Sequence, residues 1–155
     1  MNYVECADLS AQVLSISITG IPAPEFRQAL SNGLEAYNRQ TLDLWDNEPL
    51  NVFVIDAATE EAIGGLAGRT SLGVFFIDLL CLPSHLRGKG LGRDILSQAE
   101  AESRRRGCFV ATVYTMMIQA PSFYRKQGYQ EFGRVGCRPE GNARIFMRKI
   151  LSNES

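Results

Sequence analysis

The stretch of the chain with the clearest chemical potential is HLRGKGLGRDIL, residues 85–96, in which glycines alternate with basic side chains ahead of an amphipathic segment. Backbone N–H groups in a tight glycine turn, followed by a helix N-terminus, form a concave site for phosphate oxygens. Glycine permits the close approach, and basic side chains add positive charge. The pattern predicts a phosphate site that suits a diphosphate better than a single carboxylate. Its residues are Arg87, Gly88, Lys89, Gly90, Leu91, Gly92 and Arg93.

Two familiar phosphate-binding loops do not fit this stretch. The P-loop pattern GxxxxGK[ST] fails because Lys89 is followed by Gly90, and the dinucleotide pattern GxGxxG fails because Gly88 and Gly90 are followed by Arg93. Neither a nucleoside triphosphate nor NAD is therefore supported as the ligand. The alternative to any ligand is a plain strand-to-helix turn whose charges are solvated.

Hydrophobic patterning places the loop between a strand and an amphipathic helix, within a mixed sheet that helices cover. Helix 90–106 carries Leu91, Ile95 and Ala99 on one stripe, and Gly107 stands where a C-terminal cap belongs. Alternation, apolar runs and turn residues predict the other elements. These are strands at 12–20, 51–56, 62–71, 74–82, 108–116, 129–136 and 143–150, helices at 24–39 and about 120–128, and bends at Gly64, Gly65 and Gly68.

Composition indicates one globular domain over residues 1–155, with 45% hydrophobic and 21% charged residues. No apolar run is long enough for a membrane span, and Glu5 and Asp8 interrupt any export signal, so we expect a cytoplasmic protein with no membrane partner. The four cysteines are far apart and fit buried free thiols in a reducing compartment. A net charge of −1 gives no general attraction to nucleic acid, and Arg104–Arg106 suit a helix C-terminus.

Two sequence blocks together resemble the GNAT N-acetyltransferase superfamily. LCLPSHLRGKGLGRDIL is similar to its acetyl-CoA signature (Q/R)xxGx(G/A), matched by Arg87, Gly90 and Gly92. One helix and one strand later, APSFYRKQGYQEFG is similar to the family's A..FYxxxGF element. The resemblance covers about 75–150. It implies an α/β fold with a mixed, mostly antiparallel sheet of about six or seven strands and about three or four helices, in the order β-α-β-β-β-α-β-α-β-β.

The resemblance implies acetyl-CoA as the co-substrate. The backbone of residues 87–93 would hold its pyrophosphate, and its pantetheine arm would add beside Leu80, Cys81 and Leu82, where the strand parts from its neighbour after Met116. The Leu82 amide is the candidate that polarises the thioester carbonyl. Phe123 and Tyr124 would also contact the cofactor. Many members carry Asn where this chain has Met117, and Gln119 is the expected substitute.

The implied reaction is transfer of an acetyl group to the primary amine of a small molecule, by direct attack through a tetrahedral intermediate. Tyr124 matches the family's general acid, the alternative being a tyrosine that is simply core. Asp78 is a candidate general base, because regular alternation would place Phe76, Asp78 and Leu80 on one face. The alternatives are a surface carboxylate at Asp78, or a base acting through water from Asp46 or Glu48.

The acceptor pocket is expected from residues 26–48 and 129–146, as in the family. Tyr37, Trp45, Asp46 and Glu48 form an aromatic and acidic mixture that would attract a cationic amine, unless they form a solvated loop anchored by Trp45. Peptide amines, or an acyl-CoA sensor without turnover, are the alternative functions. His85, the only histidine, is expected to face solvent, and no metal is predicted. A homodimer is expected, with RIFMRKIL as a possible interface.

Overall fold

The computed structural model describes residues 4–6, 14–42 and 45–151. The chain divides into two compact units, Met1–Asp43 and Leu44–Ser155. The single domain expected over 1–155 stays a prediction. In the described residues, no helix is long and apolar enough to cross a membrane.

The first unit contains a short antiparallel strand pair and one long helix. Strands β1 (Val4–Cys6) and β2 (Leu14–Ile16) pair, and helix α1 spans Pro24–Thr41. Proline in the first helical turn costs no hydrogen bond, and the extended Leu42 ends the helix, two residues beyond the predicted end. None of the residues of α1 is buried, and its apolar stripe of Phe26, Leu30, Leu34 and Tyr37 is exposed.

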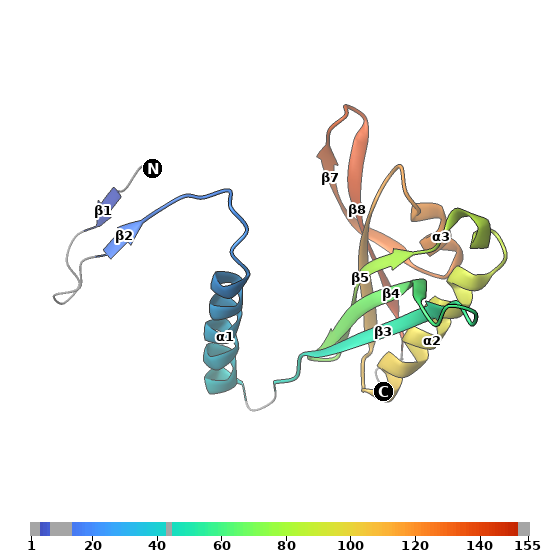
Figure 1. Ribbon diagram of the computed structural model, residues 1–155, viewed down its shortest axis with the longest axis horizontal. Coiled ribbons are helices and arrows are strands. Elements are labelled where there is room, and N and C mark those ends of the chain that lie inside the picture. Colours follow the sequence, from blue (N-terminus) through green and yellow to red (C-terminus); the bar gives the residue numbers. More distant parts are fainter. Residues whose placement is uncertain (1–3, 7–13, 43–44, 152–155) are drawn as a thin grey trace. The chain divides into compact units, whose positions relative to one another are not determined.

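The second unit is a six-stranded sheet with two helices (Figure 1). Its elements are β3 (Glu48–Ile55), β4 (Ala62–Ser71), β5 (Val74–Cys81), the 3-10 turn η1 (Ser84–Leu86), α2 (Leu91–Arg105), β6 (Val110–Met116), α3 (Pro121–Lys126), β7 (Gln130–Cys137) and β8 (Asn142–Ile150). The strand order is β3-β4-β5-β6-β8-β7, and β5 and β6 are the parallel pair among antiparallel neighbours. This confirms the predicted mixed, mostly antiparallel α/β fold.

The core lies between one face of this sheet and helices α2 and α3. Leu96 of α2 packs with Phe75, Ile145 and Met147 of the sheet, all essentially inaccessible to solvent. Full burial of such a side chain stabilises the fold by about 1.5–3 kcal/mol. Because the apolar stripe of α2 is held in this core, the helix N-terminus has a fixed position beside the end of β5.

A bulge in β5 changes which residues face the core. Ala67 pairs with Leu79, but Gly68 pairs with Ile77, so Asp78 is an extra residue in β5. Gly68 permits the close strand contact, since a Cβ there would lie 2.3 Å from the Phe76 carbonyl oxygen. The predicted bend at Gly68 is confirmed.

The bulge also overturns the expectation that Phe76, Asp78 and Leu80 share one face. Ile77 is buried and Leu80 packs against the same core, whereas Phe76 lies on the other face under the Arg69 guanidinium. The extra residue shifts the alternation by one, so the faces change over at Asp78.

Strands β5 and β6 separate part-way along their length. Their parallel pairing begins at Val74 and Val110 and ends at Ile77 and Val113. Beyond that point β6 remains paired with β8 as far as Met116. The separation begins earlier than predicted, and one side of the end of β5 has no strand partner in the part of the chain that the structure describes. Strand β8 lies between β6 and β7, so both its edges are paired and neither is free to extend a dimer sheet.

A buried ion cluster joins α2 to the last two strands. The Glu100 carboxylate is buried and accepts a hydrogen bond from Lys149 Nζ at 2.7 Å and another from the Tyr129 hydroxyl at 3.1 Å. Arg104 approaches the same carboxylate at 3.5 Å. The negative charge of Glu100 is therefore compensated by its partners. A carboxylate buried here without them would destabilise the fold.

Candidate active site

The glycine loop has the backbone geometry of an anion cradle. Gly88 and Gly90 have positive φ values of 73° and 86°, which non-glycine residues adopt only with strain. Gly90 is the N-cap of α2 and supplies no side-chain cap, and its carbonyl accepts the first helical hydrogen bond, from the Asp94 amide. The amides of the first turn of α2 have no intrahelical partners, so they can bind an anion.

A cavity of about 550 Å³ lies beside this loop. Cationic and small residues line it, together with apolar side chains from the end of β5 and from α3. Gly92 lies next to the Phe123 ring at this cavity, since a Cβ at Gly92 would be 3.4 Å from the ring. The lining residues are Leu80, Leu82, Arg87, Gly88, Gly90, Gly92, Arg93, Ala120, Phe123, Lys126 and Gln127.

The donor chemistry of this cavity fits the pyrophosphate end of CoA. The cavity is lined on its polar side by the N-terminal end of α2 and by three cationic side chains, Arg87, Arg93 and Lys126. Its apolar lining includes Leu82 and Phe123. No carboxylate is among the lining residues. A diphosphate with an attached apolar arm is therefore accommodated by charge and by shape. Lys89 and Leu91 belong to the same loop but do not line the cavity.

A second cavity of about 730 Å³ occupies the gap between the separated strands. One wall is residues 77–82 of β5 and its continuation, and the other is residues 113–116 of β6. Four residues line both cavities, and they are Leu80, Leu82, Arg87 and Ala120. The two cavities therefore adjoin, and a ligand held at the loop can reach the gap.

Tyr124 lies at the gap with its ring packed and its hydroxyl without a protein partner. Its side chain is 5% exposed and lines the second cavity. The ring packs edge-on against Phe123 and Tyr129, at centroid distances of 5.1 and 5.5 Å. Burial raises the pKa of Tyr124 to about 12, and among the described residues its hydroxyl makes no hydrogen bond. Such a hydroxyl stays protonated at neutral pH and is available to a ligand.

Asp78 also lines the second cavity, and its carboxylate forms an ion pair with Arg69. Its two carboxylate oxygens accept hydrogen bonds from Arg69 Nη1 at 2.8 and 3.1 Å, and half of its side chain is exposed. Arg69 in turn stacks over the Phe76 ring at 4.5 Å. The bulge thus presents a neutralised carboxylate at the gap.

Gln119 has a structural role at the end of β6. Its side-chain oxygen accepts a hydrogen bond from the Met116 amide at 3.1 Å, and the residue lines the second cavity. Cys81 is exposed and lines the same cavity, whereas Cys108 is buried and Cys137 is half-buried. The buried-thiol interpretation therefore does not hold for Cys81. His85 is exposed, as expected.

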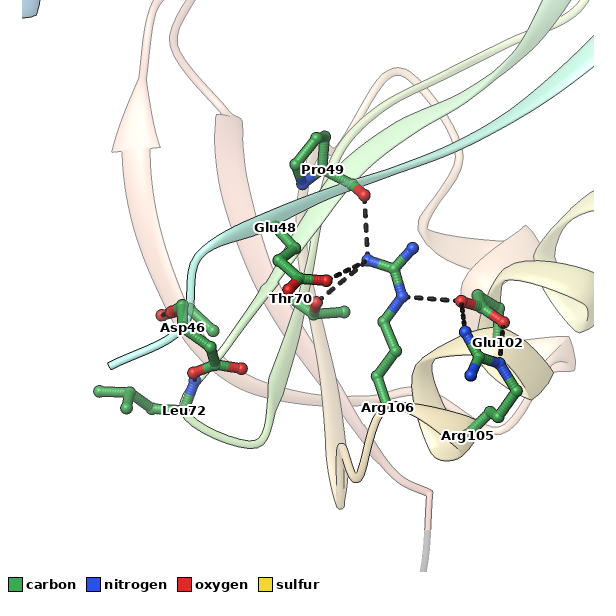
Figure 2. A network of polar contacts seen from close by, with 9 residues as sticks. Asp46, Glu48, Pro49, Thr70, Leu72, Glu102, Arg105 and Arg106 are labelled. Carbon is green, nitrogen blue, oxygen red and sulfur yellow. Dashed lines mark hydrogen bonds and ion pairs between the residues drawn. The ribbon is translucent and has the colours of Figure 1, made fainter. Parts of the chain in front are cut away.

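Two of the predicted acceptor residues, Asp46 and Glu48, lie away from this site. Asp46 accepts a hydrogen bond from the Leu72 amide at 2.6 Å, and Glu48 lies 3.9 Å from Arg106 (Figure 2). These contacts are at the turn between β4 and β5 and at the C-terminus of α2. The glycine loop is at the other end of α2, about 22 Å away at 1.5 Å per residue.

The two remaining predicted acceptor residues are Trp45 and Tyr37. Trp45 is half-buried, and its indole N–H has no hydrogen-bond partner among the described residues. Tyr37 belongs to the other unit.

The sequence analysis did not single out Tyr114 or Arg144, which line the second cavity, although Arg144 lies in the range 129–146 expected for the acceptor pocket. Both come from central strands, where Arg144 of β8 pairs in register with Met116 of β6. The alternation in RIFMRKI shows that Arg144 faces away from the core side. It does not show that Arg144 lies next to the gap, because that depends on the β6–β8 register.

Comparison with known proteins identifies the family. The model of the acetyltransferase (GNAT) domain matches residues 48–131. Acetyltransferase Atu2258 of Agrobacterium fabrum is 29% identical, covering 88% of this chain and 98% of its own. Blasticidin-S acetyltransferase of Streptomyces morookaense is 36% identical, covering 66% of this chain and 78% of its own.

Solved structures agree with these matches. A crystal structure of a protein described as an acetyltransferase from Agrobacterium tumefaciens has a TM-score of 0.82 at 28% identity, covering 88% of this chain and 99% of its own. An aminoglycoside 6'-N-acetyltransferase complexed with coenzyme A shares the fold, with a TM-score of 0.59 at 17% identity, over 70% of this chain and 76% of its own.

The chain belongs to the GNAT acetyltransferase family. Within that family it is an acetyl-CoA-dependent N-acetyltransferase.

Proposed function

We propose that this chain transfers the acetyl group of acetyl-CoA to a primary amine of a small molecule by direct attack. The observation that carries the proposal is the adjoining pair of cavities, one at the cationic glycine loop and one at the gap that contains Tyr124. The acceptor nitrogen forms a bond to the thioester carbonyl carbon through a tetrahedral intermediate, and the carbon–sulfur bond breaks. The amine loses one proton, and the thiolate of CoA gains one.

Acetyl-CoA supplies the activated acyl group, and the residues that would hold it follow the cavity walls. Residues 87–93 would bind the pyrophosphate through backbone amides, with Arg87, Arg93 and Lys126 adding charge. The unpaired side of Leu80–Leu82 offers backbone groups to a pantetheine arm, as an added strand does at a sheet edge. The Leu82 amide is the proposed donor to the thioester carbonyl.

Proton transfer is assigned to two side chains at the gap. Tyr124 would donate a proton to the departing thiolate, because its hydroxyl is protonated at neutral pH and has no hydrogen-bond partner within residues 4–6, 14–42 and 45–151. Asp78 is the proposed acceptor of the amine proton, directly or through water. Its ion pair with Arg69 keeps the carboxylate in place at the bulge.

The small-molecule acceptor is supported by the relative that is named for blasticidin S. A peptide amine is the second candidate for the acceptor. Participation of Tyr37, Trp45, Asp46 and Glu48 stays a prediction, and we do not build the acceptor site on them, because Asp46 and Glu48 have partners at the far end of the sheet.

Release of free thiol from acetyl-CoA over a panel of primary amines, with the product identified by mass, tests the function. Turnover of small amines but not of peptides is the expected result. Tight binding of acetyl-CoA without turnover of any amine would favour the alternative, an acyl-CoA sensor.

Two further expectations belong to this proposal. A cytoplasmic location is supported by the free thiols of Cys81, Cys108 and Cys137 in the described residues. A homodimer stays an expectation, and the edges of β8 do not support it. Light scattering of the full chain at micromolar concentration tests the dimer, and a monomer mass would exclude it.

A further inference from the structure

The second cavity contains a cationic side chain that the acetyl-transfer chemistry does not use. Arg144 projects from β8 beside the end of β6, and its guanidinium lies 5.4 Å from the centre of the Tyr114 ring. Both residues line the gap together with Tyr124 and Asp78. Stacking on an aromatic face leaves the edge N–H groups of a guanidinium free for another partner. Arg144 is thus positioned where an acceptor would lie.

The charges around this gap do not balance. Asp78 is the one carboxylate among its lining residues, and Arg69 already neutralises it at 2.8 Å. Arg87 also lines the cavity at the loop, and its Nε donates a hydrogen bond to the Leu82 carbonyl. Arg144 makes no ion pair with the described residues. The acceptor side of the gap therefore carries one uncompensated positive charge.

A cavity with this charge is poorly suited to a polycation. A second ammonium group on the acceptor would face Arg144 without any free carboxylate among the residues that line the gap. A carboxylate on the acceptor, by contrast, can accept two parallel hydrogen bonds from one guanidinium. The planar fork of arginine also selects carboxylates by shape, which a lysine would not do as well.

Resting on the proposed function, we infer that the acceptor of this enzyme is an amino carboxylate, whose amine is acetylated while Arg144 binds its carboxylate. The Tyr114 ring packs against the Arg144 guanidinium and limits its orientations. The site thereby requires a fixed separation between the amine and the carboxylate of the acceptor. Arg144 is a specificity residue and takes no part in moving protons.

The experiment compares matched acceptors in matched variants. The probes are glycine, 4-aminobutanoate and β-alanine, each paired with its own carboxamide, and kcat/KM is measured from thiol release at saturating acetyl-CoA. The variants are Arg144→Gln, which removes the charge, and Arg144→Lys, which keeps it. Arg148→Gln is the control, since Arg148 is exposed on the same strand but does not line the cavity.

The quantity that decides is the ratio of kcat/KM for each carboxylate to that for its carboxamide. The two amines of a pair differ in basicity, but this difference is the same in every variant. It therefore cancels when the ratio of a variant is compared with the ratio of the wild type. For the carboxylate of preferred length we expect Arg144→Gln to lower the ratio about tenfold, mainly through KM, and Arg144→Lys to restore part of it. Arg148→Gln should leave the ratio unchanged, and the Arg144 effect should shrink as salt is added.

Three results would overturn the inference, and they are distinguishable from one another. Turnover of neutral or cationic amines with no turnover of any amino carboxylate rejects this acceptor class but leaves the acetyltransferase proposal intact. An equal ratio in wild type and Arg144→Gln rejects the role of Arg144 alone. Absence of turnover with every amine, despite acetyl-CoA binding, rejects the proposed function itself and this inference with it.

Discussion

Replacing Tyr124 by phenylalanine removes one hydroxyl from the wall of the gap and leaves the ring in place. Among the described residues that hydroxyl has no hydrogen-bond partner, and the ring contacts with Phe123 and Tyr129 involve carbon atoms only. We therefore expect the free energy of unfolding to stay within about 0.5 kcal/mol of wild type. Binding of acetyl-CoA should persist, because the cationic loop is untouched.

Activity should respond very differently. Loss of a general acid lowers the rate by about 10²–10⁴-fold. At about 1.4 kcal/mol per tenfold, the transition state loses about 3–5 kcal/mol of stabilisation. The assay is kcat from thiol release, alongside thermal unfolding and acetyl-CoA titration of the same preparations.

Tyr129→Phe is the matched control, since both tyrosines are buried and their rings pack together. The Tyr129 hydroxyl donates to the Glu100 carboxylate at 3.1 Å, so its loss should cost about 1.5–3 kcal/mol of stability. Its activity at low temperature should remain near wild type, because Tyr129 is not among the residues that line the gap. If Tyr124→Phe kept full kcat, or lost stability as Tyr129→Phe does, the assignment of Tyr124 as the acid would be wrong.

Other substitutions test the loop, an ion pair and the base. Gly90→Ala and Gly107→Ala both place a side chain at a φ of 86°, which should lower the free energy of unfolding by about 1–2 kcal/mol in each variant. We expect a raised KM for acetyl-CoA only from Gly90→Ala, because Gly90, unlike Gly107, lines the cavity at the loop. Hydrogen bonds from Arg105 and Arg106 lower the pKa of Glu102 from 4.5 to about 2. The stabilisation of the fold by the Glu102 carboxylate should therefore be present above pH 4.5 and be lost as the pH falls toward 2. Acid unfolding of Glu102→Gln should accordingly depend less on pH in that range. Asp78→Asn should lower kcat/KM, and an unchanged kcat/KM would assign the base elsewhere.

Local signals in the sequence predicted the loop and its helix well. The positive φ values of Gly88, Gly90 and Gly107 occur where turn and capping rules require glycine. The strand at 62–71 was predicted with its observed bounds. These features depend on residues close together in the chain, so pattern rules can identify them.

Features that depend on pairing between distant strands could not be predicted in this way. The alternation through Phe76, Asp78 and Leu80 looks regular in the sequence, and only the pairing with Gly68 shows that Asp78 is an extra residue. Arg144 reaches the gap through the register of β8 with β6. Asp46 and Glu48 have the chemistry of amine-binding residues, but backbone and arginine partners at the far end of the sheet hold them.

The bulge in β5 makes the length of this segment as important as its chemistry. Because Asp78 shifts the alternation, removing that one residue would turn Leu80 and the residues after it to the opposite side of the sheet. All the side chains after Asp78 would be retained, but they would point to the wrong side of the sheet. Related genes should therefore contain almost no insertions or deletions between the bulge and the glycine loop. The turn 138–141 between β7 and β8, which lies outside both cavities, is under no such restriction.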